Sequence, residues 1–270
     1  MLSSQGEQEV PALGGFISAT GAMPTKISTI DYYTPINHAI TQYETVKELL
    51  RRSEEATLEI GQKYTINTFD LGVCMKALPL VWKYPEQYRD HIILPGPFHT
   101  YMNYIGMITD HKCRGSGYAE IILEAQLVTS GCLRNVLSGK AYAKALFCLK
   151  TVCEALERLL LEVFLEEKDI NISPDSLLEI IKTCNRQNLT LVLQDESIIA
   201  IIQEYLDFQD KVRKGHLGKT AVFWLSVMDH QRLVLMLIYA VKTSNRKLYH
   251  VINGKMAELF FAFDGQNYSR

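Results

Sequence analysis

The sequence lacks a strong charge of one sign, a long hydrophobic run and a secretory signal. Its 270 residues include 28 Lys+Arg and 30 Asp+Glu, so the formal net charge is −2. This balance argues against a strongly basic nucleic-acid-binding domain, and DNA contact would need a local basic patch. The most apolar run, Leu233–Val241, is about half a membrane span. It therefore predicts a core helix and no membrane anchor.

Cysteine pairs at CxxC spacing are also absent. Several of the six cysteines lie in apolar helical runs. This distribution indicates buried thiols in a reduced, intracellular chain, and it argues against a disulfide framework. The first 25 residues lack a basic start followed by an apolar core. Because they are rich in Gly, Ser, Ala and Gln, residues 1–25 are predicted to be a disordered leader.

Residues 26–115 alternate between helical and strand patterns, and 47% of the whole chain is apolar, enough for a buried core. A β-branched and aromatic segment, Lys26–Tyr33, is typical of an edge strand. The following segments predict helix, strand, helix, strand and helix in turn: Tyr43–Ile60, Tyr64–Phe69, Leu71–Trp82, His91–Leu94 and Phe98–Ile108. This order indicates a small, largely parallel sheet with helices packed on it.

Residues 116–270 show helical spacing without strands, so the fold class is α/β turning to mostly α. No internal repeat is present. The predicted helices are Ala119–Val128, Ser138–Glu167, Asp175–Cys184, Ser197–Arg213, Ala221–Thr243 and Lys247–Phe263.

Asp70 and His99 follow the two predicted strands. Asp70 comes directly after Phe69, and His99 lies beyond the turn that ends the strand His91–Leu94. If the strands are neighbours, both residues emerge at one sheet edge, where open α/β sheets place ligands and metals. The alternatives are a helix N-cap for Asp70 and a buried histidine at a helix start for His99.

Two other segments with polar residues are not expected to form a metal or nucleotide site. Asp110, His111 and Cys113 lack a fourth zinc ligand at usual spacing, so they indicate a solvated loop. The segment Gly215–Thr220 is similar to a phosphate loop, but Arg213 stands where the first glycine belongs and no strand precedes it. We therefore expect no nucleotide cofactor.

Several sequence segments, in a fixed order, resemble those of a known protein family from about residue 32 to the C-terminus. The chain resembles a large family of transposon-related proteins multiplied in animal genomes, notably those of corals and other aquatic animals. That family is similar to DDE/D cut-and-paste transposases with a ribonuclease-H-like core. The matching segments are Tyr64–Trp82, Leu94–Ile108, Gly115–Ala125, Leu137–Leu160, Phe223–Tyr249 and Phe260–Arg270.

The resemblance implies an incomplete ribonuclease-H-like sheet and a set of relic site residues. In such transposases, carboxylates hold two divalent metals, Mg²⁺ or Mn²⁺, at a sheet edge. Asp70 matches the strand-end aspartate and would be a metal ligand, and His99 matches a histidine that orients substrate or a metal-bound water. Glu124 and Asp264 match further acidic positions of the family.

The departures from the family predict a truncated, catalytically inactive member. A ribonuclease-H-like core opens with a three-stranded meander carrying the first catalytic aspartate, whereas Asp31 lies in no central-strand context. Pro97 replaces a family glycine, and the sequence ends at Arg270, where family members continue. Loss of one carboxylate usually abolishes metal-assisted phosphoryl chemistry.

Two functions from different classes follow. The first is a transposon-derived, transposase-like remnant with residual DNA binding, in which case the protein would be nuclear. The alternative is a helical protein-interaction module without enzymatic activity, able to self-associate through open apolar faces. A third alternative is an unselected reading frame of a mobile element, which would neither bind DNA nor bind a protein partner.

Overall fold

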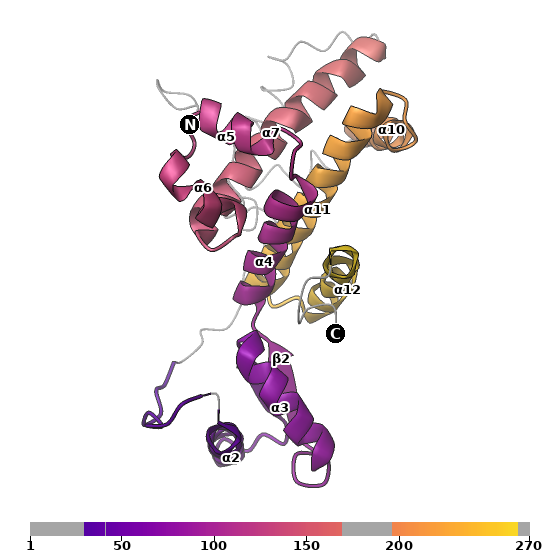
Figure 1. Ribbon diagram of the computed structural model, residues 1–270. Helices are drawn as coiled ribbons and strands as arrows, with labels where there is room; N and C mark the ends of the chain where they lie inside the picture. The colour runs from indigo at the N-terminus through magenta and orange to yellow at the C-terminus, as the bar shows by residue number, and fades with distance from the viewer. Residues whose placement is uncertain (1–29, 41, 169–195, 264–270) are drawn as a thin grey trace, which may run out of the picture. The chain divides into compact units, whose positions relative to one another are not determined.

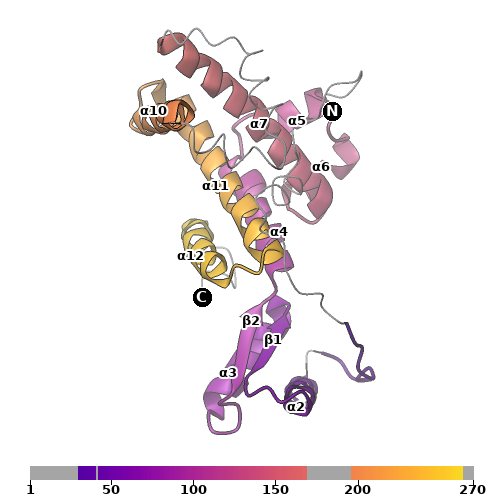
Figure 2. The ribbon, with the colours of Figure 1, turned by 180° about the vertical axis from the view of Figure 1, so that it is seen from behind.

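The computed structural model describes residues 30–40, 42–168 and 196–263. They fall into two compact units, Ile27–Asn103 and Tyr104–Ser269 (Figures 1 and 2). The fold is mostly helical with a small parallel sheet, which confirms the predicted change from α/β to mostly α. The expected leader, the helix expected at 175–184 and Asp264 lie outside the described residues.

The first unit is built on two parallel strands, as predicted. The strands pair in register from Thr65 with His91 to Phe69 with Pro95. The elements of this unit are α2 (Tyr43–Glu59), β1 (Thr65–Phe69), α3 (Leu71–Lys83), β2 (His91–Pro95) and the start of α4 (Pro97–Gly106). Gly61, at φ +72°, turns the chain after α2 into the left-handed conformation that glycine adopts without strain.

The core of this unit forms where α2 and α3 meet the sheet. Apolar side chains at helical spacing on each helix point to a common interior. The buried residues are Val46, Leu50, Val73, Ala77, Leu80 and Tyr88, with Phe69, Val81 and Ile93 packed against them.

The predicted edge strand is wrong for residues 30–33, the part of Lys26–Tyr33 that the structure describes. These residues form no strand, and Ile30 and Tyr32 are 75% and 93% exposed. The sheet of the described residues consists of β1 and β2 alone. The β-branched composition predicted a strand wrongly because neither β1 nor β2, the strands of the described residues, pairs with the backbone of this segment.

The second unit is helical throughout its described residues. Its elements are η1 (Met107–Lys112), α5 (Tyr118–Glu124), α6 (Ser130–Leu137), α7 (Tyr142–Glu167), α10 (Glu196–Arg213), α11 (Gly218–Lys242) and α12 (Arg246–Ala262). The sequence pattern did not predict α6, which is only 8 residues long. A helix of two turns shows too few repeats of the 3.6-residue period to be recognised.

Helix α11 is the central element of this unit. It packs against α7, α10, α12 and η1, and Val227, Val234 and Leu237 on it are fully buried. In both views α10 lies near its N-terminal end and α12 near its C-terminal end (Figures 1 and 2). By length and composition α11 could also cross a membrane, a test that core helices of soluble proteins pass as well.

The two units divide between Asn103 and Tyr104, inside α4, whereas the sequence predicted a division after residue 115. Helix α4 continues into η1, and Ile105 of α4 and Ile108 of η1 are both fully buried. These residues belong to the helical unit because η1 packs on α11.

Candidate functional site

The predicted edge site begins at the ends of β1 and β2. The strands are parallel neighbours, so Asp70 and the segment leading to His99 leave the sheet at the same end. Asp70 Oδ1 accepts a hydrogen bond of 2.9 Å from the backbone N–H of Val73. Asp70 is therefore the N-cap of α3, which confirms the capping alternative.

The histidine lies in the first turn of α4. Its ring lies edge-on to Phe98, with ring centroids 5.5 Å apart. Its backbone carbonyl accepts a hydrogen bond from the side chain of Asn103. These contacts place His99 at a helix start, but the residue is half-buried there, whereas the alternative interpretation expected a buried histidine.

The other acidic candidates do not join Asp70 in a described cluster. Glu124 is the exposed last residue of α5, which belongs to the other unit. Asp264 lies outside the described residues. Among residues 30–40, 42–168 and 196–263, no group of three or more His, Cys, Asp or Glu side chains could hold a metal ion. The Mg²⁺ or Mn²⁺ site at Asp70 therefore stays a prediction.

The cluster Asp110, His111 and Cys113 does not form the expected solvated loop. Asp110 and His111 lie in η1, a π-helical continuation of α4, and Cys113 is 3% exposed. Burial raises the pKa of the Cys113 thiol to about 11. The interpretation as a loop was wrong because a π-helix lacks the 3.6-residue period by which helices are recognised.

An apolar groove on α7 and α11 is a site that sequence reasoning missed. It encloses a cavity of about 320 Å³, and its lining is almost entirely apolar. On α7 the lining residues follow helical spacing, and Leu159 is 57% exposed. The groove is lined by Leu156, Leu159, Leu160 and Val163 of α7, by Leu217 just before α11, and by Thr220, Ala221, Trp224, Leu225 and Met228 of α11.

The groove consists of two apolar stripes that run beside each other. A stripe at positions i, i+3, i+4 and i+7 is the pattern by which a helix packs against another helix. Here part of each stripe covers the other helix, and part lines the open groove. A groove with this shape and this apolar lining can bind a third helix that is amphipathic.

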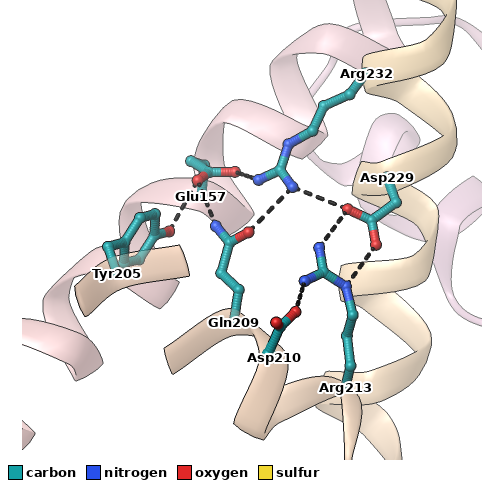
Figure 3. A network of polar contacts seen from close by, with 7 residues as sticks. All are labelled: Glu157, Tyr205, Gln209, Asp210, Arg213, Asp229 and Arg232. Atoms are coloured by element: carbon teal, nitrogen blue, oxygen red, sulfur yellow. Dashed lines mark hydrogen bonds and ion pairs between the residues drawn. The ribbon is translucent and has the colours of Figure 1, made fainter. Parts of the chain in front are cut away.

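A polar network joins α7, α10 and α11 (Figure 3). Arg232 lies at its centre. One guanidinium nitrogen, Nη2, lies 2.6 Å from Glu157 Oε2, and Nη1 lies 2.9 Å from Asp229 Oδ1. Nη1 also donates to the side-chain oxygen of Gln209 at 3.2 Å.

The network extends on both sides of Arg232. Arg213 donates two hydrogen bonds to the carboxylate of Asp229, at 3.0 and 2.9 Å, and another to Asp210 at 2.7 Å. The Tyr205 hydroxyl donates to Glu157 Oε1 at 2.8 Å. Because each charge faces an opposite charge, this network holds three helices together and presents no open charged site. The sequence carried no signal for it, since Glu157 and Arg232 are 75 residues apart.

The segment that is similar to a phosphate loop forms the turn between α10 and α11 and the start of α11. Gly215 and Gly218 adopt φ values of +101° and +85° there. A helix precedes the turn, and Arg213 is engaged in the network above. The phosphate-loop interpretation therefore stays rejected on geometry as well as on spacing.

Comparison with known proteins identifies a family. No curated protein and no solved structure is significantly similar to the chain. One family model, described as a domain of unknown function (DUF8702), matches residues 14–270. The match spans both units, so the chain belongs to the DUF8702 family.

Proposed function

We propose that this chain is a helical protein-interaction module without enzymatic activity, and that the groove on α7 and α11 receives an amphipathic helix of a partner protein. The observation that carries the proposal is the pair of apolar stripes at helical spacing that lines the groove. An incoming helix with apolar residues at i, i+3 or i+4 and i+7 would match that spacing.

Exposure and side-chain type also support binding at the groove. Leu159 is 57% exposed although it lies among apolar neighbours, and Trp224 lines the opposite wall. Large apolar and aromatic side chains in a concave surface are typical anchors of protein interfaces. The ion pairs of Arg232 keep α7 beside α11, so both walls are in place before a partner arrives.

The experiment is a selection from a display library of helical peptides. We expect peptides with Leu or Phe at i, i+3 or i+4 and i+7 to bind the full chain and to lose at least tenfold in affinity in Leu159→Arg. The matched control is Phe147→Arg, because Phe147 is 46% exposed on the same helix but does not line the groove. Failure to select any such peptide, or equal losses in both variants, would contradict the proposal.

A second copy of the chain is the other occupant to test. Sedimentation of the wild type and Leu159→Arg at several concentrations measures self-association directly. If the wild type forms a dimer that Leu159→Arg dissociates, and no helical peptide binds, then the groove receives a second copy of the chain and not a helix of a partner protein.

The transposon-derived, ribonuclease-H-like remnant with residual DNA binding is the second candidate. The parallel strands, with Asp70 and His99 following their ends on one side, favour it. The exposed residues Lys211, Lys214 and Lys219 near the α10–α11 turn offer a local basic patch. We expect weak, salt-sensitive DNA binding that is lost in the triple alanine variant, and no nicking with Mn²⁺. The whole candidate fails if no salt-sensitive binding is found.

A further inference from the structure

A polar cavity of about 740 Å³ lies beside α6 in the second unit. Its volume is in the range of about 300–1,000 Å³ that is typical of ligand sites. It shares no lining residue with the groove on α7 and α11, so a ligand bound here is independent of the proposed function. The polar lining residues are Asp110 of η1, Ser130, Arg134 and Asn135 of α6, and Ser138 and Lys140 of the turn that follows α6.

The charged residues of the lining are two cations and one carboxylate. Arg134 and Lys140 are exposed, and within the described part of the chain neither forms an ion pair. Oδ1 of the carboxylate, Asp110, lies 3.4 Å from Arg114, a residue outside the lining. An anionic group in the cavity would therefore gain the charge of both cations without displacing a described carboxylate from either of them.

Two close contacts fix η1 against the turn after α6. Thr109 Oγ1 donates a hydrogen bond of 2.6 Å to the carbonyl oxygen of Leu137, which lines the cavity. At Gly106, the residue before η1, an added Cβ would lie 2.8 Å from the carbonyl oxygen of Ser138. Glycine permits this close approach because it has no Cβ. The two backbones are therefore held together before a ligand arrives, which lowers the entropic cost of binding.

The carboxylate of the lining belongs to a π-helix, which is a rare conformation. This helix, η1, follows α4 directly and spans Met107–Lys112. Short π-helical segments that continue an α-helix occur frequently at functional sites. Asp110 is the residue of η1 that lines the cavity, so the irregular helix and the cavity coincide at this carboxylate. This coincidence indicates a binding site independently of the two cations.

We propose that this cavity binds a sugar phosphate, a ligand that carries a phosphate dianion and several hydroxyl groups. The planar guanidinium of Arg134 donates paired hydrogen bonds to phosphate oxygens, and Lys140 adds a second positive charge. Ser130 is the first residue of α6, whose amino-terminal end adds a partial positive charge. Asp110 accepts hydrogen bonds from the sugar hydroxyls.

The mixed charge of the lining is what selects both halves of this ligand. A phosphate ion without a sugar is attracted by the two cations, but it is repelled by the carboxylate of Asp110 and leaves that acceptor largely unused. A neutral sugar uses the acceptor but gains nothing from the two positive charges. A ligand with a phosphate at one end and hydroxyl groups at the other makes favourable contacts with all three charged residues.

The test is an NMR titration of the backbone amide signals of the full chain, at constant ionic strength because salt screens exposed charges. The probes are glucose 6-phosphate, ribose 5-phosphate, glucose and inorganic phosphate. We expect at least one sugar phosphate to bind at low millimolar concentration, at least tenfold more tightly than glucose and fivefold more tightly than phosphate. If neither sugar phosphate binds, or if phosphate binds as tightly as both, the proposal is overturned.

The first variant, Asp110→Ala, tests the sugar end of the site. Attraction to the cations is common to the sugar phosphate and to inorganic phosphate, so it cancels in the ratio of their affinities. We expect this ratio to fall at least fivefold, while phosphate still binds and thereby shows that the cavity is intact. An unchanged ratio would refute the role of the carboxylate.

The second variant, Arg134→Gln with Lys140→Gln, tests the phosphate end. We expect the affinities for the sugar phosphate and for inorganic phosphate both to fall at least fivefold. The matched control is Lys144→Gln with Arg158→Gln, which removes the same charge from exposed residues of α7 that do not line the cavity. The control should change both affinities by less than twofold, and equal losses in the two double variants would show nonspecific attraction and refute the assignment.

Discussion

The hydroxyl of Tyr104 lies 2.7 Å from Nδ1 of His230, a residue 126 positions later in the chain. The contact ties α4 to α11 in the second unit, and the ring of Phe260 from α12 packs edge-on against Tyr104 at 5.4 Å. Burial, reinforced by Lys112, lowers the pKa of His230 to about 4. The ring is therefore neutral at pH 7 and shares a hydrogen bond with the tyrosine hydroxyl, whose own pKa burial raises.

The first prediction is a loss of stability in mild acid. In the unfolded chain His230 takes up its proton near the ordinary pKa of 6.5, but in the folded protein only near 4. Below pH 6.5 the unfolded state therefore binds more protons, so stability falls as pH falls toward 4, by about 2–3 kcal/mol in total. Urea unfolding from pH 7.5 to 4 measures this. His230→Gln keeps an acceptor for Tyr104 but does not titrate, and it should show a shallower slope; an unchanged slope would exclude His230 as the cause.

The second prediction compares two buried tyrosines in the same unit. Tyr104→Phe removes the hydroxyl that hydrogen-bonds Nδ1 of His230, which should cost about 1–2 kcal/mol. The Tyr118 hydroxyl is buried and has no hydrogen-bond partner in the described part of the chain. Tyr118→Phe should therefore be neutral or stabilising by about 1 kcal/mol. Urea unfolding of both variants decides, and equal losses would contradict the assignment.

The third prediction concerns the network in Figure 3. Arg232→Ala leaves Glu157 and Asp229 without their shared cation, and the partly exposed site limits the expected cost to about 1–2 kcal/mol. Arg158 is the control because its ion pair among the described residues is with Glu154 of the same helix, and its side chain is 55% exposed. Its alanine variant should lose at most about 0.5 kcal/mol. Denaturant midpoints give both values, and similar losses would mean that the network adds nothing beyond surface pairs.

The fourth prediction separates the cap from the relic metal site at Asp70. Asparagine caps a helix as well as aspartate does, so Asp70→Asn should keep stability while Asp70→Ala loses about 1 kcal/mol. Thermal unfolding measures both. If Mn²⁺-dependent DNA nicking occurs and Asp70→Asn abolishes it in a fully folded protein, the chain is an active enzyme and the inactive assignment fails.

The fifth prediction is an order of thiol reactivity. The hydrogen bond with the Thr129 side chain lowers the pKa of Cys132, whereas burial raises the pKa of Cys113 to about 11 and that of Cys153 to about 12. Because the thiolate is the reactive form, iodoacetamide should label Cys132 well before Cys113 and Cys153 in the folded protein. Peptide mass spectrometry resolves the sites. Simultaneous labelling of the three thiols under native conditions would contradict the burial of two of them.

Local features of the fold could be predicted from the sequence. The amphipathic pattern after Tyr43 predicted α2, and the β-branched run before Asp70 predicted β1 within one residue of its start. The alternation of patterns also predicted that β1 and β2 pair in parallel, because a helix between two strands brings them side by side with the same direction. The pattern at Lys26–Tyr33 misled for the described residues 30–33, since strand composition without a partner strand makes no strand.

The sequence by itself therefore determined the longer helices, the two strands and the alternatives at Asp70, because spacing, capping and turn residues act over a few neighbouring positions. Only the tertiary structure decided what long separations bring together. The groove of α7 and α11, the ion pair of Glu157 with Arg232 and the contact of Tyr104 with His230 depend on how helices pack. No local period encodes such pairings, because each side chain finds its partner only when two distant helices lie against each other.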